Sequence, residues 1–492
     1  MVFISVITLM KKTTLMPSQT EVKIRKAVTK MLNTSAAINR QFRNPFRKHM
    51  FLTGVHAPML EELTLDDLKV TGEIPAALSG KYARIGPNPF NPDPRGHHWF
   101  VGDGMVHGIR ISNGKAEWYH NRYIKAGTLE KKGGPTAAGG PRRGARDTVN
   151  TNVLKLADKT LALVESGPFP FELDENLDTA QSTNFGGGLT APFTAHPHED
   201  PKTGEWHAIT YESETQDKVW HVVINREGEV ISERAIPVQD GPSIHECCLT
   251  DDYVVVFDLP VTISLTALAQ GYHFPYRWND NHKARIGLLP RQGEVSGIVW
   301  CDVDPCYVFH VANSFQNPDG SVTIDCCAYE SMFAHGPDGP NGVPCGFERW
   351  HVDPSTQKVT RNTLDASPQE FPRIDERYFG QRYRHTWIMG QPSETVSNFV
   401  AENKLYHHDL ETGERKHFSF GTNMIGGEFV FVPRDESAEE GDGWLMGLVI
   451  DAKADTTQLQ FFDALNIENG PVGAIHIPHR IPPGFHGNWI PD

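Results

Sequence analysis

Short runs of apolar residues, some alternating with polar ones, recur along most of the chain from about residue 65 onward. Gly, Pro, Asp and Asn separate these runs, as in NPDG at 317–320 and ETGE at 411–414. Runs of this length that are rich in Val, Ile, Phe and Tyr, between turn-forming residues, predict β-strands. The clearest predicted strands lie at 80–86, 160–165, 206–213, 218–225, 252–260, 321–330, 428–434, 443–450 and 458–465.

The predicted strands favour an all-β fold. The 44 Gly and 35 Pro leave little room for long helices, and no fixed-period repeat is evident. Many short strands without alternating helices favour a β-propeller or several β-sandwiches. A chain of 492 residues could hold about two to four average domains, but large β-folds of this size also form one unit.

Residues 1–45 differ in texture and predict a separate basic tail. The first 50 residues hold ten Lys and Arg and one acid, whereas the rest of the chain holds 36 basic and 60 acidic residues. Between lysines of the tail, the apolar residues at roughly helical spacing are Val22, Val28, Met31, Leu32 and Ile38. This spacing is typical of a weak amphipathic helix, which could lie on an anionic membrane or be part of a disordered tail.

Charge and cysteine usage narrow the class of protein. The acidic body argues against a nucleic-acid-binding surface. Seven cysteines without regular spacing or a CxxC pair fit reduced thiols in the cytoplasm and argue against structural zinc. The apolar stretch at 1–10 is followed, not preceded, by its charges, unlike a secretory signal, and no run of 18 apolar residues could span a membrane. We therefore expect a cytoplasmic protein, with peripheral membrane contact left open.

Four of the 23 histidines share a setting beside predicted strands: His196, His245, His310 and His486. They are 49, 65 and 176 residues apart, so local helix geometry cannot gather them, whereas strands of a closed propeller converge on its axis. Four imidazoles would make a nitrogen-only site, which suits Zn, Cu, Ni and Fe. Without a carboxylate ligand, a divalent metal stays cationic with two octahedral positions open, an arrangement suited to O2 activation at Fe(II).

Seven segments then place the sequence in a family context. In chain order, from about Phe51 to Trp489, these are IPAALSGKYARIGPNPFNP, HHWFVGDGMVHG, FTAHPHEDP, IHECCLTDDYVVVFDLP, FHVANSF, EFPRID and GFHGNW. Together they resemble the carotenoid cleavage oxygenase family, which includes retinal-pigment isomerohydrolase and bacterial and fungal carotenoid or apocarotenoid dioxygenases. The resemblance implies one catalytic domain over 46–492, a seven-bladed β-propeller capped by loops and short helices. It also implies Fe2+ on the axis, bound by the four histidines, with His198 as a neighbour only.

The resemblance further implies three glutamates that orient iron-bound imidazoles through their second ring nitrogen. Glu165 would orient His245, Glu370 would orient His310, and Glu428 would orient His486, whereas His196 would have no such partner. Unpaired carboxylates would be costly in these apolar strands. Two further site residues are implied: Thr151 near the open iron position and Phe100 in the wall of the substrate cleft. Trp99, beside Phe100, could line the cleft or lie in the core.

The family reaction is cleavage of a C=C bond with O2 to give two carbonyl products. Stilbene-cleaving members bind a 4-hydroxyl through a lysine directly before the first orienting glutamate and a tyrosine in an AYRNP-like segment. Here Val164 and the Gly/Pro-rich loop 133–147 stand at those places. The resemblance therefore favours an apolar conjugated alkene, a carotenoid or apocarotenoid, with a stilbene as the alternative.

Another departure is HECC at 245–248, where many members have HDFA. A non-catalytic lipid-binding propeller is a hypothesis of another class, against which the complete histidine and glutamate sets argue. The sequence gives no indication of oligomeric state.

Overall fold

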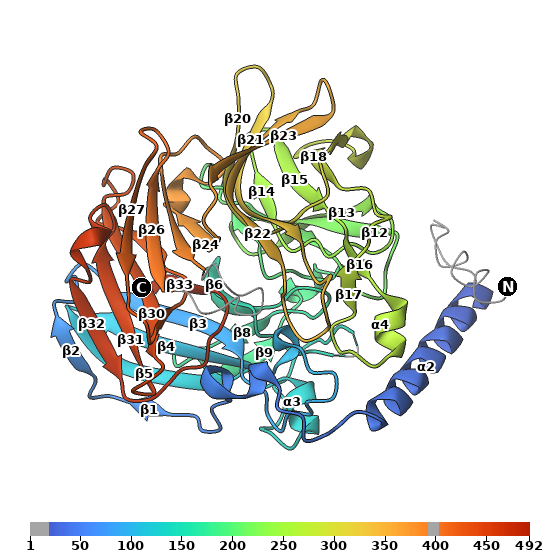
Figure 1. Cartoon of the computed structure of the whole chain (residues 1–492), viewed down its shortest axis with the longest axis horizontal. Helices are drawn as coiled ribbons and strands as arrows, with labels where there is room; N and C mark the ends of the chain where they lie inside the picture. Colours follow the sequence, from blue (N-terminus) through green and yellow to red (C-terminus); the bar gives the residue numbers. More distant parts are fainter. Residues whose placement is uncertain (1–18, 145, 392–402) are drawn as a thin grey trace.

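The chain folds into β-sheets arranged around a common centre (Figure 1). The structure, a computed structural model, describes residues 19–144, 146–391 and 403–492. Within these residues nearly all regular structure is β-strand, and the sheets are arranged as a β-propeller. The prediction of an all-β propeller is therefore confirmed.

Three four-stranded sheets each come from one continuous segment, with every strand paired to the next. The first contains β6 (Asn152–Leu156), β7 (Lys159–Leu163), β8 (Phe171–Leu173) and β9 (Thr179–Ser182). The second contains β10 (His198–Glu199), β11 (Trp206–Thr210), β12 (Lys218–Ile224) and β13 (Val230–Pro237). The third contains β24 (Gln369–Ile374), β25 (His385–Gly390), β26 (Lys404–Asp409) and β27 (Glu414–Ser419). A hairpin consists of β16 (Val261–Ile263) and β17 (Tyr276–Trp278).

Two sheets join the beginning of the described chain to its end. One has the order β1 (Thr64–Leu65), β5 (Lys115–Tyr123), β4 (Gly104–Ser112), β3 (Gly80–Pro87) and β33 (Gly487–Pro491). The other has the order β2 (Lys69–Gly72), β32 (Gly473–Ile477), β31 (Thr456–Asp463), β30 (Gly443–Asp451) and β28 (Met424–Gly426), with β29 (Val430–Pro433) also paired to β30. The antiparallel pairs β3–β33 and β2–β32 close the ring.

The largest sheet bears on the number of blades. It has eight strands in the order β14 (Cys247–Leu249), β15 (Tyr253–Asp258), β18 (Arg285–Pro290), β19 (Val299–Asp302), β23 (Lys358–Asp365), β22 (Val343–Asp353), β21 (Val322–Ser331) and β20 (Tyr307–Gln316). Its two halves are joined only by one parallel residue pair, Asp302 with Lys358. Divided there, the described sheets of four or more strands number seven; undivided, they number six. The predicted number of seven blades requires this division, so it stays a prediction.

Helices are short in the described residues, apart from one near the beginning. They are α2 (Gln19–Gln41), α3 (Gly127–Lys131) and α4 (Leu265–Ala269), with 3-10 turns at Met50–Leu52, Gly54–His56, Trp99–Val101, Phe185–Gly187, Val295–Gly297, Glu376–Tyr378 and Ile467–Asn469. None of the helices in this described part combines the length and apolarity needed to cross a bilayer. All seven cysteines are free, and six of them are buried.

Helix α2 covers the segment in which the sequence predicts an amphipathic helix, and Figure 1 shows it beside α4. Leu32 and Ala36 are buried, and the Asn39 side-chain amide donates to the Ala269 carbonyl over 2.9 Å. Met31 and Ile38 are about half exposed. Residues 1–18 of the predicted tail lie outside the described residues, and a domain boundary at residue 45 stays a prediction.

Candidate metal centre

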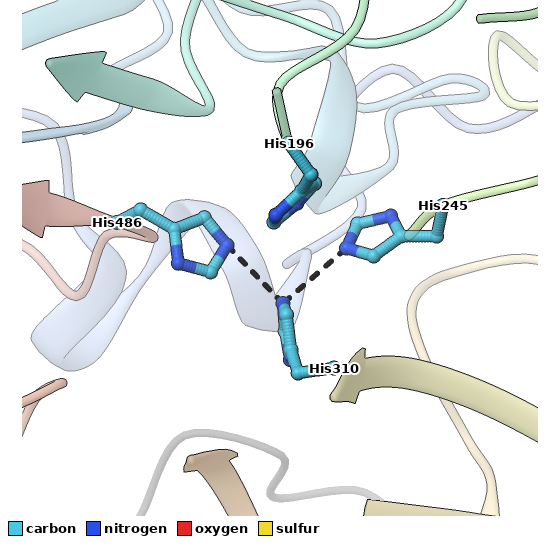
Figure 2. Close-up of side chains that lie close together, drawn as sticks. All are labelled: His196, His245, His310 and His486. Carbon is cyan, nitrogen blue, oxygen red and sulfur yellow. Dashed lines mark hydrogen bonds between the residues drawn. The ribbon is translucent and has the colours of Figure 1, made fainter. Parts of the chain in front are cut away.

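Four histidine side chains from distant parts of the chain converge at the centre of the propeller (Figure 2). They are His196, His245, His310 and His486, and none is more than 7 % exposed. Nε2 of His310 lies 3.3 Å from Nε2 of His245 and 3.2 Å from Nε2 of His486. Ligand nitrogens of all four lie within 4.8 Å of one another. The structure thus brings together the four histidines that the sequence analysis selected.

Each of these histidines lies at or beside the end strand of its sheet. His196 and His245 each precede their strand, β10 or β14, by two residues. His486 directly precedes β33, and His310 lies within β20. Because β10, β14, β20 and β33 each end the strand order of their sheets, sheet edges meet at the centre, and the eight-stranded sheet contributes both of its edges, β14 and β20. Residues far apart in sequence therefore meet there.

The nitrogen separations suit one metal ion. Metal–imidazole bonds of about 2.1 Å, as for zinc, place two nitrogens about 3.0–3.4 Å apart at ligand angles of about 90–109°. Nε2 of His196 is buried and has no hydrogen-bond partner among the described residues, which is rare for a buried polar atom unless an ion or water belongs there. The donor set therefore fits a divalent transition metal.

A glutamate contacts the outward ring nitrogen, Nδ1, of three of the histidines. The pairs and their N–O distances are Glu165 with His245 at 2.9 Å, Glu370 with His310 at 2.5 Å, and Glu428 with His486 at 3.0 Å. Since each carboxylate accepts a hydrogen bond from the Nδ1–H of its histidine, it favours the tautomer in which Nε2 carries a lone pair for a metal. These are the three pairs that the family resemblance implies.

Further donors hold the three glutamates in place. They are the Tyr211 hydroxyl on Glu165 at 2.6 Å, the Tyr329 hydroxyl and the Phe371 N–H on Glu370 at 3.1 and 2.7 Å, and the Gly487 N–H on Glu428 at 3.1 Å. The Arg373 guanidinium also lies 3.3 Å from Glu428. Every orienting carboxylate is therefore fixed by a second group, which restricts the imidazole that it contacts.

A backbone irregularity in β24 explains how Glu370 and its neighbour both face His310. Adjacent residues of a regular strand point to opposite faces. Here the pairing register shifts after Glu370, and Phe371 has a φ of 55°, in the left-handed region. The carboxylate and the Phe371 ring, whose centroid lies 5.0 Å from that of His310, then share one side of the strand. Such a conformation costs about 1–3 kcal/mol and is typical of functional sites.

The electrostatics favour ionised glutamates and a neutral imidazole. Burial alone would raise the pKa of Glu428, but Arg373 and His486 outweigh it and lower that pKa to about 2. Burial likewise opposes ionisation of Glu165, and His245 reverses the effect so that its pKa is lowered. Burial, reinforced by the other histidines, holds the pKa of His196 well below its ordinary value. The neutral imidazole, not the imidazolium cation, is the form that binds metals.

A cavity of about 1230 Å³ leads from α2 to this centre. His245, His310 and His486 line its inner end, and Leu32 and Ile38 of α2 line its outer end. Apolar and aromatic side chains make up much of the wall between them, namely Phe100, Val164, Ile263, Leu265, Leu268, Phe274, Phe309, Phe371 and Phe485. The volume exceeds the roughly 300–1,000 Å³ of ordinary small-molecule pockets, which favours an elongated apolar ligand.

The structure also locates the remaining predicted site residues. Phe100 and Thr151 both line the cavity. The Thr151 carbonyl accepts from the His486 N–H over 3.1 Å, and its hydroxyl donates to Asn150 over 2.9 Å. Trp99 instead is 2 % exposed and stacks on Phe51 with centroids 5.3 Å apart, so the core interpretation holds for this residue.

Comparison with known proteins identifies the family. Residues 56–491 match the family described as "Retinal pigment epithelial membrane protein". The "Carotenoid cleavage oxygenase" of Mycobacterium tuberculosis (strain ATCC 25618 / H37Rv) is 36 % identical over 489 residues, which cover 90 % of this chain and 97 % of that protein. The chain belongs to the carotenoid cleavage oxygenase family.

Solved structures of this family share the fold. Pseudomonas brassicacearum lignostilbene dioxygenase superposes with a TM-score of 0.82 at 26 % identity, covering 92 % of this chain and all of that one. The cobalt-substituted apocarotenoid oxygenase of Synechocystis superposes with a TM-score of 0.78 at 25 % identity, covering 88 % and 97 %. The cobalt-substituted relative shows that metal binding occurs within the carotenoid cleavage oxygenase family. The four-histidine cluster of the present chain is a candidate metal site in agreement with this.

Sequence reasoning missed a carboxylate and two hydroxyls at this site. The expectation that His196 lacks a carboxylate partner is wrong, because Oε2 of Glu246 lies 3.3 Å from its Nδ1. The Tyr276 hydroxyl lies 3.3 Å from the Ser166 hydroxyl, and both residues line the cavity. No motif marks Tyr276, which comes from the β16–β17 hairpin, whereas Ser166 directly follows the selected Glu165.

Proposed function

We propose that this protein is a non-heme Fe2+ dioxygenase that cleaves a C=C bond of a carotenoid or apocarotenoid with O2. The C=C bond breaks and each carbon gains one atom of O2, so two carbonyl products account for both oxygen atoms and no further reductant is needed. The observation that carries the proposal is the long, largely apolar cavity that ends at His245, His310 and His486.

In this proposal, the four histidines hold Fe2+ and Glu165, Glu370 and Glu428 orient three of them. Once bound, the metal supplies the O2-activating chemistry, which no amino-acid side chain provides. The protein binds and positions the polyene. The rings of Phe100, Phe309, Phe371 and Phe485 line the cavity and suit a conjugated chain. Thr151 also lines it, and its carbonyl accepts from the His486 N–H. No side-chain nucleophile or general base is required.

Delivery of so apolar a substrate favours a role for α2. This helix lies at the outer end of the cavity, where Met31 and Ile38 are 49 % and 50 % exposed beside Lys30. An amphipathic basic helix with exposed apolar residues suits the surface of an anionic membrane, where polyenes partition. We therefore propose peripheral membrane contact through α2 for a protein of the cytoplasm.

A stilbene is the second candidate substrate class, and one observation favours it. The Tyr276 and Ser166 hydroxyls line the cavity and could bind a phenolic oxygen, although Val164 offers no donor. The similarity to a lignostilbene dioxygenase points the same way. A non-catalytic lipid-binding propeller is disfavoured, because lipid binding alone gives no reason for four imidazoles with aligned carboxylates.

The test is aerobic incubation of the Fe2+-loaded protein with an apocarotenal and with resveratrol, followed by mass analysis of the products. We expect two carbonyl fragments from the apocarotenal, with both oxygens labelled by 18O2 when exchange with water is controlled. Cleavage of resveratrol alone would transfer the protein to the stilbene class. Binding of both without turnover would support the lipid-binding hypothesis.

A further inference from the structure

The histidine without an expected partner has an acidic neighbour of its own. Oε2 of Glu246 lies 3.3 Å from Nδ1 of His196, and the two side chains are 4 % and 6 % exposed. Glu246 directly follows another member of the cluster, His245. It is therefore a buried carboxylate near the outward nitrogen of His196, on the side where the other three histidines have their glutamates, at a longer distance than the 2.5–3.0 Å of those hydrogen bonds.

The other oxygen of Glu246 is held by two donors. Oε1 accepts from the Cys247 N–H over 2.9 Å and lies 2.7 Å from Nε2 of His198. The His198 ring is itself stacked on Phe379, with centroids 4.3 Å apart and an interplanar angle of 10°. These contacts fix the carboxylate through one oxygen and leave the other turned toward His196.

We propose that Glu246 is a fourth positioning residue, which holds His196 with the proton on Nδ1 so that Nε2 is free to bind the metal. The inference rests on the proposed metal site. Within the His196 ring, Nε2 is a buried nitrogen without a hydrogen-bond partner among the described residues, as a nitrogen facing a metal would be. A carboxylate on the far nitrogen fixes the ring and makes it a stronger ligand.

The local sequence explains why this chain has such a contact. The segment is HECC at 245–248, and the residue after His245 is a glutamate, not a shorter acid. An aspartate there is shorter by one methylene, about 1.5 Å. From the 3.3 Å position of Glu246, that shortening moves the carboxylate out of hydrogen-bond range of His196 unless the backbone moves. His198 thus holds Glu246, and Glu246 in turn contacts His196.

The decisive variant is Glu246→Gln, because of how an amide must sit in this pocket. If the amide oxygen keeps the Cys247 N–H, the amide NH2 faces Nδ1 of His196 and opposes the proton there. The ring is then driven to the tautomer with the proton on Nε2, which cannot bind a metal. We expect loss of metal to a chelator about 10- to 100-fold faster than from the wild type, the usual effect at such positions.

The readout is the full-length protein loaded with Co2+, whose visible absorption reports the ligand geometry independently of turnover. Glu246→Gln should change the cobalt bands as well as the release rate. Glu246→Asp, which keeps the charge but loses the 3.3 Å contact with His196, should lose metal more slowly than Glu246→Gln and faster than the wild type. The matched control is Glu348→Gln. Glu348 is also buried and accepts from Trp350 Nε1 over 2.6 Å and Arg361 Nε over 2.9 Å, far from any proposed metal ligand in sequence. The Glu348→Gln variant should have altered thermal stability and an unchanged cobalt spectrum.

Two failures are distinguishable. If Glu246→Gln and Glu246→Asp both keep the wild-type spectrum and release rate while Glu428→Gln loses metal, the role of Glu246 is refuted and the metal site stands. If the wild type binds no cobalt or iron through the four histidines, the proposed function itself fails, and the inference about Glu246 falls with it.

Discussion

The replacement Glu370→Gln separates the charge of an orienting carboxylate from its hydrogen bonds. Oε2 of Glu370 accepts from both His310 and the Phe371 N–H, and Oε1 accepts from the Tyr329 hydroxyl. A glutamine whose amide oxygen takes the Oε2 position keeps the first two bonds. Its NH2 can donate to the Tyr329 hydroxyl, which is able to accept as well as donate. The amide therefore keeps the His310 and Phe371 bonds, reverses the direction of the Tyr329 bond, and removes the negative charge.

Alanine at this position would test folding instead of metal binding. It would remove the shared acceptor of three buried hydrogen bonds, those from the His310 ring N–H, the Phe371 N–H and the Tyr329 hydroxyl. At about 1.5–3 kcal/mol for each hydrogen bond to a charged group, the total is about 4.5–9 kcal/mol. That is comparable to the whole free energy of unfolding of a typical protein, about 5–15 kcal/mol. Glutamine is therefore the informative substitution.

We expect Glu370→Gln to weaken iron retention by about 10- to 100-fold, or about 1.4–2.7 kcal/mol, with little change in the thermal unfolding of the metal-free protein. The assay is anaerobic transfer of Fe2+ to a chromogenic chelator, with calorimetry of the apoprotein as the control. Glu428→Gln should lose metal as well, and should also destabilise the apoprotein, because it removes a charge beside the partly buried Arg373. Wild-type iron retention in Glu370→Gln would refute the reasoning.

Three further predictions concern the metal ligands, the substrate cavity and helix α2. X-ray absorption of the iron-loaded protein should fit one iron per chain with four imidazole nitrogens and no protein carboxylate; a fitted carboxylate ligand would contradict the proposed coordination. In competition, an apocarotenal should be cleaved about 10- to 100-fold more efficiently than resveratrol, because burying a phenolic hydroxyl without a partner beside Val164 costs about 1–3 kcal/mol. Equal turnover would mean that the Tyr276 and Ser166 hydroxyls bind the phenolic oxygen. Tyr276→Phe should then reduce cleavage of resveratrol. Replacing Met31 and Ile38 by Glu should reduce co-sedimentation with anionic vesicles severalfold while turnover of detergent-dispersed substrate is kept, and unchanged sedimentation would exclude α2 as the membrane contact.

The sequence selected the four histidines that meet at the candidate metal centre because they lie in local motifs. His196, His245 and His486 lie within two residues of the short strands β10, β14 and β33, and the strand–turn pattern of the whole chain favoured a β-propeller or several β-sandwiches. The three glutamates followed from the family motifs and not from spacing. Their pairing with particular histidines depends on which sheet edges meet, which alternation along a strand does not encode.

Glu246 shows why the rest was harder to predict. Neighbours in a regular strand face opposite sides, so a residue directly after His245 is not an obvious candidate for the same site. Both residues precede β14 in an irregular segment, and both turn inward. Tyr276 was missed for a related reason: it reaches the cavity on a hairpin separate from the main sheets, and its role depends on tertiary packing.

The closure of the ring by β3 and β33 has a consequence for how the protein is made. His486 directly precedes β33, whose partner β3 lies near the beginning of the described chain. A nascent chain that has exposed His196, His245 and His310 still lacks both the fourth ligand and the strand that draws the ring shut. Pairings between such distant segments form late in folding. Under the proposed function, metal insertion would follow translation of β33, and a metal-loaded molecule would be one whose ring has already closed.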